Sequence, residues 1–353
     1  MKIKFLQDIL KDNEAFFVTS EVSRLYLTGF SSTDGYLVVK KNDACFFTDG
    51  RYIEDAGKKV VSCNSELFDG FDRIKKFLSD NVSTIFVEND YITISELEKY
   101  KNVFDNYIIS EKNILNSSLI EMRSKKSNVE IESLKKAQSI AEKAFYEILN
   151  YIKVGRTEIE VASYLEYCMR KNGGEKVSFE TIVVSGKKSS VPHGVPTEKK
   201  ICSGDFVTMD FGTVVDGYHG DMTRTVVVGK ADEMQKEIYE TVLKAQNSAI
   251  DAVKSSVRCS DVDKAARDVI ENSGYGKYFC HSTGHGVGLE IHENPAVSPK
   301  SDKILLSGNV ITIEPGIYLP GKFGVRIEDF GVVTQNGFIN FTKADKHLIE
   351  INN

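Results

Sequence analysis

The sequence contains no run of about 18 apolar residues, the length that a helix needs to cross a bilayer. Its first 17 residues are amphipathic and include Asp8, Asp12 and Glu14, so they lack the apolar stretch and the cleavage site of a secretory signal. The hydrophobic fraction is 41% and the charged fraction 27%, as in ordinary globular proteins. We therefore expect a soluble, cytoplasmic protein that makes no contact with membranes.

Cysteines and basic clusters are also scarce. The six cysteines are scattered without a CxxC pair, which excludes a disulfide framework and indicates reduced thiols. The net charge is -6 and no long basic block is present, so the electrostatic signature of nucleic-acid binding is absent. No period of 20 to 50 residues indicates a solenoid. A small molecule or a peptide is the expected ligand.

The length of 353 residues exceeds what one hydrophobic core usually supports, so two domains are expected. In the first 120 residues, segments 36–40, 44–48 and 84–87 resemble strands and segment 71–78 resembles a helix. A polar break is expected at residues 116–118, and Ser127 with Glu130 forms a capping box for a long helix. We predict an α/β domain over residues 1–122 and a second domain over residues 123–353.

The second domain mixes strands with pairs of helices. A second capping box, Thr157 with Glu160, predicts a helix that ends near residues 173–174. Further helices are predicted at 232–254 and 260–272, and strands at 181–185, 206–211, 225–228, 310–313 and 331–334. This arrangement is typical of the α+β class.

Two aspartates flank a predicted hairpin turn at Asp216-Gly217. With a two-residue turn, Asp221 lies opposite Gly212, and Asp210 becomes its diagonal neighbour on the same face of the sheet. Gly212 between them would leave room for a metal and a ligand. Taken alone, such a pair is more often two surface aspartates near a turn.

A second pair of acids flanks a turn centred on Gly321. A three-residue loop there would place Glu314 opposite Glu328, although Pro315 leaves this register open. Four clustered carboxylates would repel one another strongly unless cations lay between them. The two hairpins together therefore indicate a cation site.

A histidine completes the predicted ligand set. Glycines on both sides of His285 let the backbone approach closely and leave the imidazole free to face a cavity. Any one of the histidines here, taken singly, is more often a structural residue. The clustering of His281, His285 and His292 with turn glycines, together with His193 in a Pro-His-Gly segment, favours a functional site.

Four carboxylates and one imidazole favour oxygen-preferring divalent ions, Mn²⁺ first, with Co²⁺, Zn²⁺ or Fe²⁺ as alternatives. The set fits two ions better than one. Such a pair is suited to hydrolysis, in which a bridging hydroxide attacks a carbonyl that one ion polarises.

These segments resemble metallopeptidase family M24, whose catalytic domain has the pita-bread fold. The resemblance rests on Met209-Asp-Phe-Gly, the segment from Asp216 to Arg224, the segment from His281 to Gly288, Glu314-Pro-Gly and Val325-Arg-Ile-Glu-Asp. It implies that the metal ligands are Asp210, Asp221, His285, Glu314 and Glu328, with Asp221 and Glu328 bridging the ions and Glu314 acting also as the general base. It implies catalytic roles for His193, His292 and Arg326, although Arg326 could instead be a strand residue paired with Glu328 or Asp329.

The N-terminal segments Arg24–Phe30, Asp34–Val39 and Phe46–Tyr52 resemble a creatinase-like N-terminal domain. That resemblance implies an Xaa-Pro aminopeptidase, with an Xaa-Pro dipeptidase as the alternative and a metal-free binding protein as a remote one. The implied substrate is a proline-containing peptide and the implied assembly a homodimer. His219-Gly220 departs from the family pattern and could alter the cavity wall.

Overall fold

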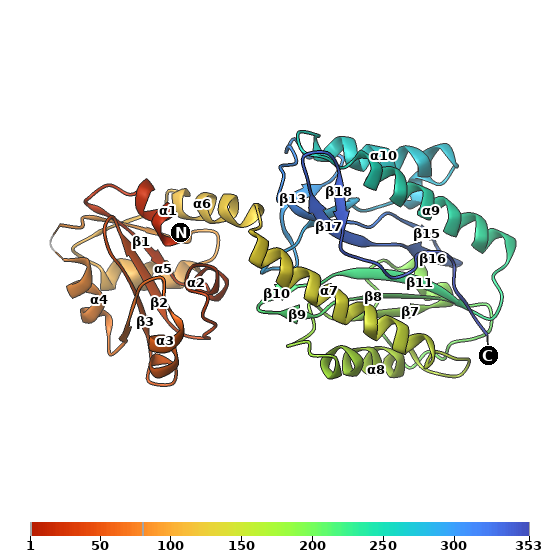
Figure 1. Ribbon diagram of the computed structural model, residues 1–353, viewed down its shortest axis with the longest axis horizontal. Helices are drawn as coiled ribbons and strands as arrows, with labels where there is room; N and C mark the ends of the chain where they lie inside the picture. Colours follow the sequence, from red (N-terminus) through yellow and green to blue (C-terminus); the bar gives the residue numbers. More distant parts are fainter. Residues whose placement is uncertain (1, 80, 353) are drawn as a thin grey trace. The chain divides into compact units, whose positions relative to one another are not determined.

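The computed structural model describes residues 2–79 and 81–352. Contacts divide the chain into two compact units, Met1–Arg123 and Ser124–Asn353 (Figure 1). None of the described helices combines the length and the apolar character that crossing a bilayer requires. Each unit has its own sheets and its own hydrophobic core.

The first unit is a mixed six-stranded sheet in the order β4-β3-β2-β1-β5-β6, accompanied by short helices. Strand β1 pairs antiparallel with β2 and parallel with β5. The elements are α1 (Lys2–Ile9), β1 (Glu14–Val18), α2 (Glu21–Thr28), β2 (Tyr36–Lys40), β3 (Ala44–Thr48), α3 (Ile53–Lys59), β4 (Asn64–Leu67), α4 (Phe71–Leu78), β5 (Thr84–Val87), α5 (Ile94–Val103), β6 (Ile108–Ser110) and α6 (Ile114–Ser124). The three strands and the helix predicted in this region are confirmed.

The break predicted at residues 116–118 is wrong, because these residues lie inside α6. The Ser118 hydroxyl donates to the carbonyl of Ile114, one turn earlier, so the polar side chain is satisfied within the helix. Leu115 and Leu119 are buried on the same face of α6. Four-residue apolar spacing therefore outweighs the local preference of serine and asparagine for turns.

The second unit contains two main sheets, in the orders β19-β11-β8-β7 and β13-β12-β14-β17-β18. Its helices are α7 (Asn128–Leu149), α8 (Glu158–Lys171), α9 (Glu233–Ala252) and α10 (Cys259–Asn272), with 3-10 turns η1 (Gly186–Ser190) and η2 (Gly276–Tyr278). Its strands are β7 (Ile182–Ser185), β8 (Phe206–Phe211), β9 (Val214–Val215), β10 (Tyr218–His219), β11 (Met222–Val228), β12 (Gly284–Gly286), β13 (Glu293–Val297), β14 (Val310–Ile313), β15 (Gly316–Leu319), β16 (Phe323–Arg326), β17 (Asp329–Val333), β18 (Phe338–Asn340) and β19 (Glu350–Ile351).

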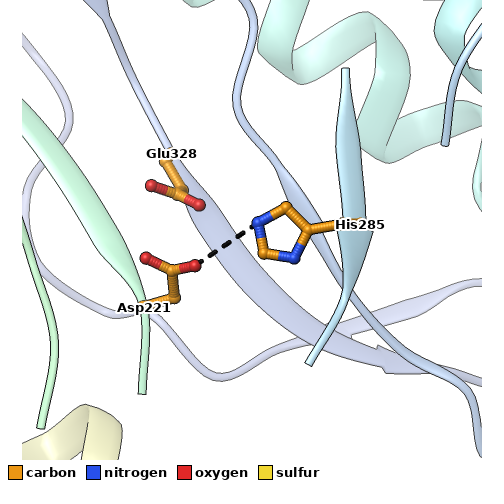
Figure 2. Close-up of side chains that lie close together, drawn as sticks. All are labelled: Asp221, His285 and Glu328. Carbon is orange, nitrogen blue, oxygen red and sulfur yellow. Dashed lines mark ion pairs between the residues drawn. The ribbon is translucent and has the colours of Figure 1, made fainter. Parts of the chain in front are cut away.

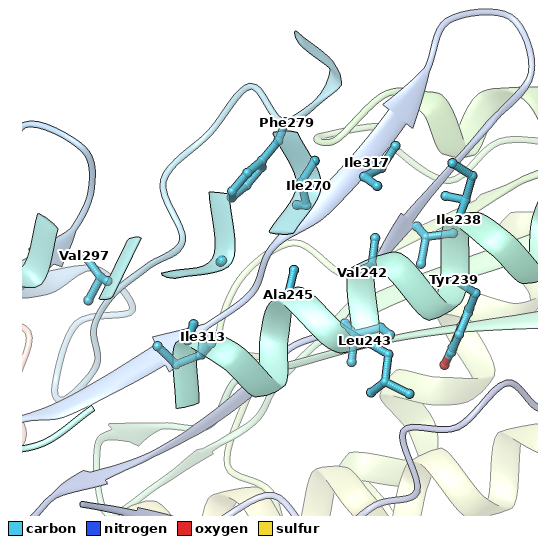
Figure 3. Packing of buried hydrophobic residues seen from close by; sticks show 14 of the residues in the cluster. Ile238, Tyr239, Val242, Leu243, Ala245, Ile270, Phe279, Val297, Ile313 and Ile317 are labelled. Atoms are coloured by element: carbon cyan, nitrogen blue, oxygen red, sulfur yellow. The ribbon is translucent and has the colours of Figure 1, made fainter. Parts of the chain in front are cut away.

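Helix pairs cover the sheets through two hydrophobic clusters. Helices α7 and α8 pack with β7, β8 and β11 in one cluster. Helices α9 and α10 pack with β14 to β16 in the other, which includes Ile238, Val242 and Ala245 of α9 together with Ile313 and Ile317 (Figure 3). The predicted α+β class is confirmed.

Both predicted capping boxes are present. The Ser127 hydroxyl accepts from the Glu130 N–H while the Glu130 carboxylate accepts from the Ser127 N–H, and Thr157 and Glu160 repeat this arrangement. Each pair satisfies backbone donors that the first helical turn would otherwise leave unpaired. The caps therefore fix the starting points of α7 and α8.

The registers of the two hairpins follow the predictions. Tyr218 pairs with Val215, and Thr223 with Asp210, as a two-residue turn at Asp216-Gly217 requires. In the second hairpin, Ile313 pairs with Asp329 on one side of Pro315 and Gly316 with Arg326 on the other. Both pairs belong to one register, which places Glu314 opposite Glu328 where the ladder is interrupted.

Candidate metal centre

Three of the predicted ligands meet at one point. Potential ligand atoms of Asp221, His285 and Glu328 all lie within 4.8 Å of one another, and their side chains converge from β12 and from the residues directly before β11 and β17 (Figure 2). Nε2 of His285 lies 3.6 Å from Oδ2 of Asp221 and 3.4 Å from Oε1 of Glu314. The fifth residue, Asp210, joins the group through Arg326.

Backbone hydrogen bonds to other strands explain how segments so far apart in sequence converge. Pro315 has no N–H to donate, so one long bond, from the Ile327 N–H to the Pro315 carbonyl at 3.5 Å, joins the two sides of the hairpin there. At the next pair, which is not hydrogen-bonded across the hairpin, the N–H of Glu314 donates to the carbonyl of Thr283 at 2.7 Å, and that of Glu328 donates to the carbonyl of Thr223 at 3.1 Å. Each glutamate is thereby fixed beside the strand that presents His285 or Asp221.

Glycines allow the close backbone packing around the centre. A Cβ atom at Gly284 would lie 2.0 Å from the carbonyl oxygen of Thr312, and one at Gly212 would lie 1.9 Å from that of Gly220. The prediction that Gly212 leaves room for a metal and a ligand is therefore wrong, because the Gly220 backbone fills that space. At Gly212 the glycine is required for strand packing.

The His219-Gly220 departure lies outside the cavity wall, contrary to expectation. Neither residue is among the described residues that line the cavity. Nδ1 of His219 lies 3.1 Å from the carbonyl oxygen of Ser178, and a Cβ at Gly220 would lie 3.2 Å from the Ala137 backbone. Gly220 therefore packs against α7, and His219 contacts the backbone at Ser178.

Arg326 links the two carboxylate pairs. Its Nη2 donates to Oδ2 of Asp210 at 2.7 Å, while its Nε donates to the Thr223 hydroxyl at 3.0 Å. The sequence had left Glu328 or Asp329 as an alternative partner of Arg326. Asp210 takes that place instead, and Asp329 pairs with Arg224 at 2.8 Å. Arg326 is thus held by the site itself.

Two residues in this network were missed in the sequence. The Thr223 hydroxyl donates to Oε2 of Glu328 at 2.7 Å, and the Tyr318 hydroxyl accepts from Nη1 of Arg326 at 2.8 Å. The sequence pattern that points to them is the two-residue period of strands, in which every second side chain lies on the same face. Thr223 follows Asp221 by two positions and Tyr318 follows Glu314 by four. A search for same-face neighbours of each predicted ligand would have identified both residues.

The charges of the cluster are mutually unfavourable. Burial raises the pKa of Asp221 well above its ordinary value, and the neighbouring Asp210 and Glu314 raise it further. Burial and the Asp221 charge raise the pKa of Glu328 in the same way. Burial also raises the pKa of Glu314 to about 8, although Arg326 opposes the shift. Without a cation, these acids favour their protonated forms.

The tautomer and the protonation state of His285 suit a metal ligand. Its Nδ1 lies 3.0 Å from the Gly286 carbonyl, which can only accept, so Nδ1 carries the proton and the Nε2 lone pair faces the acids. Burial lowers the pKa of His285 to about 4, which keeps the ring neutral near pH 7. In addition, Oδ1 of Asp210 is buried without a hydrogen-bond partner among the described residues. The donor set fits divalent cations.

The centre lies in a cavity of about 590 Å³. Asp210, Asp221, His285, Glu314, Glu328 and Arg326 all line it, together with His193, His281 and His292. The ring of His292 lies 4.4 Å from that of His285, measured between centroids, and both His193 and His292 are exposed. Apolar side chains from Phe179, Ile182, Val195 and Ile291 also line it. The cavity thus combines charged and polar groups with apolar surface.

Comparison with known proteins agrees with this geometry. Residues 132–335 match metallopeptidase family M24, and residues 2–120 match the creatinase/prolidase N-terminal domain. The chain is 39% identical over 352 residues to the Xaa-Pro dipeptidase of Pyrococcus furiosus, covering 98% of each chain. It resembles the solved structure of an Xaa-Pro dipeptidase from Bacillus anthracis with a TM-score of 0.93 and 41% identity, covering 99% of this chain and 98% of that one.

A solved X-Pro aminopeptidase from Thermotoga maritima is similar as well, with a TM-score of 0.91 and 35% identity, covering 99% of this chain and 98% of that one. The names of the similar proteins favour the dipeptidase alternative over the aminopeptidase reading. The M24 match contains the five predicted ligands and both hairpins. This chain belongs to metallopeptidase family M24 and has a pita-bread catalytic domain preceded by a creatinase/prolidase N-terminal domain.

Proposed function

We propose that the chain is a dimetal Xaa-Pro dipeptidase, which hydrolyses the bond between an N-terminal residue and a following proline. The observation that carries the proposal is the convergence of Asp221, His285 and Glu328, with Glu314 and Asp210 beside them, in the wall of one cavity. Relatives named Xaa-Pro dipeptidase support the choice of substrate. Proline makes the preceding bond a tertiary amide without an N–H and fixes φ, so a dedicated site is physically reasonable.

Two divalent ions held by the five ligands would supply Lewis-acid polarisation of the scissile carbonyl and a lowered pKa for water. In this proposal Asp210, Asp221, His285, Glu314 and Glu328 would hold the ions. Mn²⁺ is the preferred ion because oxygen ligands predominate. Measuring metal content and activity after reconstitution with Mn²⁺, Co²⁺, Zn²⁺ or Fe²⁺ tests this choice.

The protein residues contribute positioning and proton transfer. Glu314 accepts the proton of the attacking water at its carboxylate, and its contact with Thr312 Oγ1 at 3.2 Å orients that group. His193 and His292, both exposed in the cavity, contact the substrate and stabilise the developing oxyanion. Arg326 orients Asp210 by donating to its Oδ2, which leaves Oδ1 without a hydrogen-bond partner among the described residues and available to a divalent ion.

One observation favours an Xaa-Pro aminopeptidase as the second candidate. Among the described residues that line the cavity, Arg326 is the one lysine or arginine, and Asp210 and Tyr318 already engage it. The carboxylate of a bound dipeptide would therefore lack a free cationic partner in this unit. A longer peptide, whose carboxylate lies farther away, would not need one.

Substrate length decides between the two candidates. The Mn²⁺-loaded protein is incubated with an Xaa-Pro dipeptide, an Xaa-Pro tripeptide and a Met-Ala peptide, and the products are measured. Cleavage of the dipeptide alone supports the dipeptidase, and cleavage of the tripeptide supports the aminopeptidase. Cleavage of the Met-Ala peptide alone would contradict both.

The proposal includes the domain limits 1–122 and 123–353, a cytoplasmic location and a homodimer. Limited proteolysis, cell fractionation and light scattering respectively test these statements.

A further inference from the structure

The loop that carries His193 is fastened at both ends by one buried carboxylate. Glu158, the first residue of α8, has no exposed surface. Its Oε1 accepts from the N–H and the hydroxyl of Ser185, at 2.7 and 2.9 Å, at the end of β7. Its Oε2 accepts from Lys188 Nζ at 2.8 Å, and from the N–H and hydroxyl of Thr197 at 3.1 and 2.8 Å. Five hydrogen bonds thus close residues 185–197 into a loop.

This loop, residues 186–196, forms part of the cavity wall. Pro192, His193, Val195 and Pro196 line the cavity beside the acids. No hydrogen bond of the His193 imidazole is found within residues 2–79 and 81–352, and the side chain is exposed. The location of this ring therefore depends on the backbone that carries it.

Other contacts hold the middle of the loop. The hydroxyl of Ser189 accepts from the Gly324 N–H at 2.9 Å and donates to the Gly186 carbonyl at 2.7 Å. Nη1 of Arg326 donates to the Pro192 carbonyl at 3.2 Å, directly before His193. The loop is thus attached to β16 at its centre and to Glu158 at its ends.

The ionised form of Glu158 is the one that this arrangement stabilises. Burial alone would raise its pKa, but the hydrogen bonds from Lys188, Thr197 and Ser185 hold it below its ordinary value. Charge-assisted hydrogen bonds are about twice as strong as neutral ones, and a buried carboxylate stripped of such donors is strongly unfavourable. The loop and the carboxylate therefore stabilise each other.

We propose that Glu158 is a positioning residue of the reaction, which holds the 186–196 loop so that His193 faces the metal centre. This inference rests on the proposed function, because it acts through a histidine assigned to substrate binding. Glu158 itself does not line the cavity. Its effect is transmitted through the backbone between Ser185 and Thr197.

The test compares Glu158→Gln with wild type, both loaded with Mn²⁺. Glutamine has the same shape but presents an N–H₂ group to donors, so at least one of the five hydrogen bonds is lost. We expect kcat/KM on an Xaa-Pro substrate to fall about 10- to 100-fold, as for residues that orient a catalytic group. Glu166→Gln is the matched control, since Glu166 lies on the same helix and outside this loop, and its activity should remain at the wild-type level.

A double-mutant cycle separates positioning from a general loss of structure. In a His193→Ala background, Glu158→Gln should have less than about a twofold further effect, because the group that it positions is absent. An undiminished effect in that background would overturn the proposal. Metal content should be the same in all variants, and a loss of metal on Glu158→Gln alone would also overturn it.

Hydrogen exchange tests the loop without any substrate. Amides of residues 186–196 should exchange faster in Glu158→Gln than in Glu166→Gln, while the α7 amides remain unchanged. Unaltered exchange in the loop would refute the role of Glu158, whereas lack of Xaa-Pro cleavage by the wild type would refute only the proposed function.

A second variant is available if Glu158→Gln does not fold. Thr197→Val removes one donor to Glu158 and should produce the same changes in exchange and activity to a smaller extent. Wild-type exchange and activity in that variant would overturn the proposal.

Discussion

Arg326 donates a 2.7 Å hydrogen bond to Oδ2 of Asp210 and leaves Oδ1 of that carboxylate buried without a hydrogen-bond partner in the described part of the chain. An unsatisfied buried carboxylate oxygen costs on the order of 1–3 kcal/mol. A cation at Oδ1 would offset that cost. The arginine thus fixes which oxygen of Asp210 is available for a metal.

Arg326→Lys should weaken metal binding. Lysine cannot reproduce the guanidinium contacts with Asp210, Thr223 and Tyr318, so Asp210 would lose its fixed orientation. We expect a roughly 10- to 100-fold lower affinity for the more weakly bound ion, measured by titration calorimetry with Mn²⁺. Arg258→Lys, at an exposed position, is the control. Unchanged Mn²⁺ affinity would show that Asp210 is oriented without Arg326.

Asp221→Asn should remove activity and metal together while the protein remains folded. Asparagine preserves the shape of a residue that is 3% exposed but removes a charge that would hold the ions. Because burial and the neighbouring acids disfavour that charge, the metal-free variant should unfold at a higher urea concentration than metal-free wild type at pH 8. Near-normal activity would remove Asp221 from the site.

Local patterns in the sequence predicted much of the fold. Capping boxes at Ser127 and Thr157 and the Asp216-Gly217 turn act within a few residues, so each could be recognised without tertiary information. Side chains alternate between the two faces of a strand, and this alternation, together with the turn, placed Asp210 and Asp221 on one face of the hairpin. Segment 116–118 was mispredicted because burial of Leu115 and Leu119, a tertiary effect, determines its helix.

The supporting residues of the site were harder to predict. Glu158 and Ser185 are separated by 27 positions, and Thr223 and Glu328 by 105, so neither contact has a local signature. The sequence also indicated nothing about the Gly220 backbone that occupies the space above Gly212. Such contacts depend on how the two hairpins and their neighbouring loops meet in space.

His292→Ala should reduce turnover without affecting the metals. The ring packs against His285 at 4.4 Å and lines the cavity, but it is not among the three clustered ligands. Loss of a group that transfers a proton or stabilises charge typically costs about 10²- to 10⁴-fold. Metal analysis and kcat on the same preparation provide the measurement. A metal content below that of wild type would instead assign His292 to the ligand set.

Lys126→Met should destabilise the second unit. Nζ of Lys126 lies 2.8 Å from Oε2 of Glu293, and the two side chains are only 2% and 5% exposed. Removing one partner of a buried ion pair typically costs about 3–5 kcal/mol, to be measured by urea unfolding.

Lys135→Met serves as the control for Lys126→Met. It breaks an exposed pair with Glu132 and should cost at most about 1 kcal/mol. Glu293→Gln added to Lys126→Met should recover part of the loss, since no buried charge then remains unpaired. Equal destabilisation by Lys126→Met and the control would contradict this account.

Metal should abolish the pH dependence of stability that the metal-free protein shows. In the metal-free protein, Glu314 has a pKa raised to about 8, and Asp221 and Glu328 are also raised, chiefly by burial. The folded state then binds more protons than the unfolded chain, so the stability from these groups is present below pH about 4 and is lost as pH rises through about 8. Buried histidines such as His285, with a pKa lowered to about 4, oppose this only below about pH 6.5.

We therefore expect the free energy of unfolding of chelator-treated protein to fall between about pH 7 and 8.5. Mn²⁺ should abolish the fall, because the carboxylates are already ionised in the metal-bound protein. Urea unfolding at fixed ionic strength measures both. A flat or rising profile without metal would show that the acids of this cluster do not share the predicted electrostatic conflict.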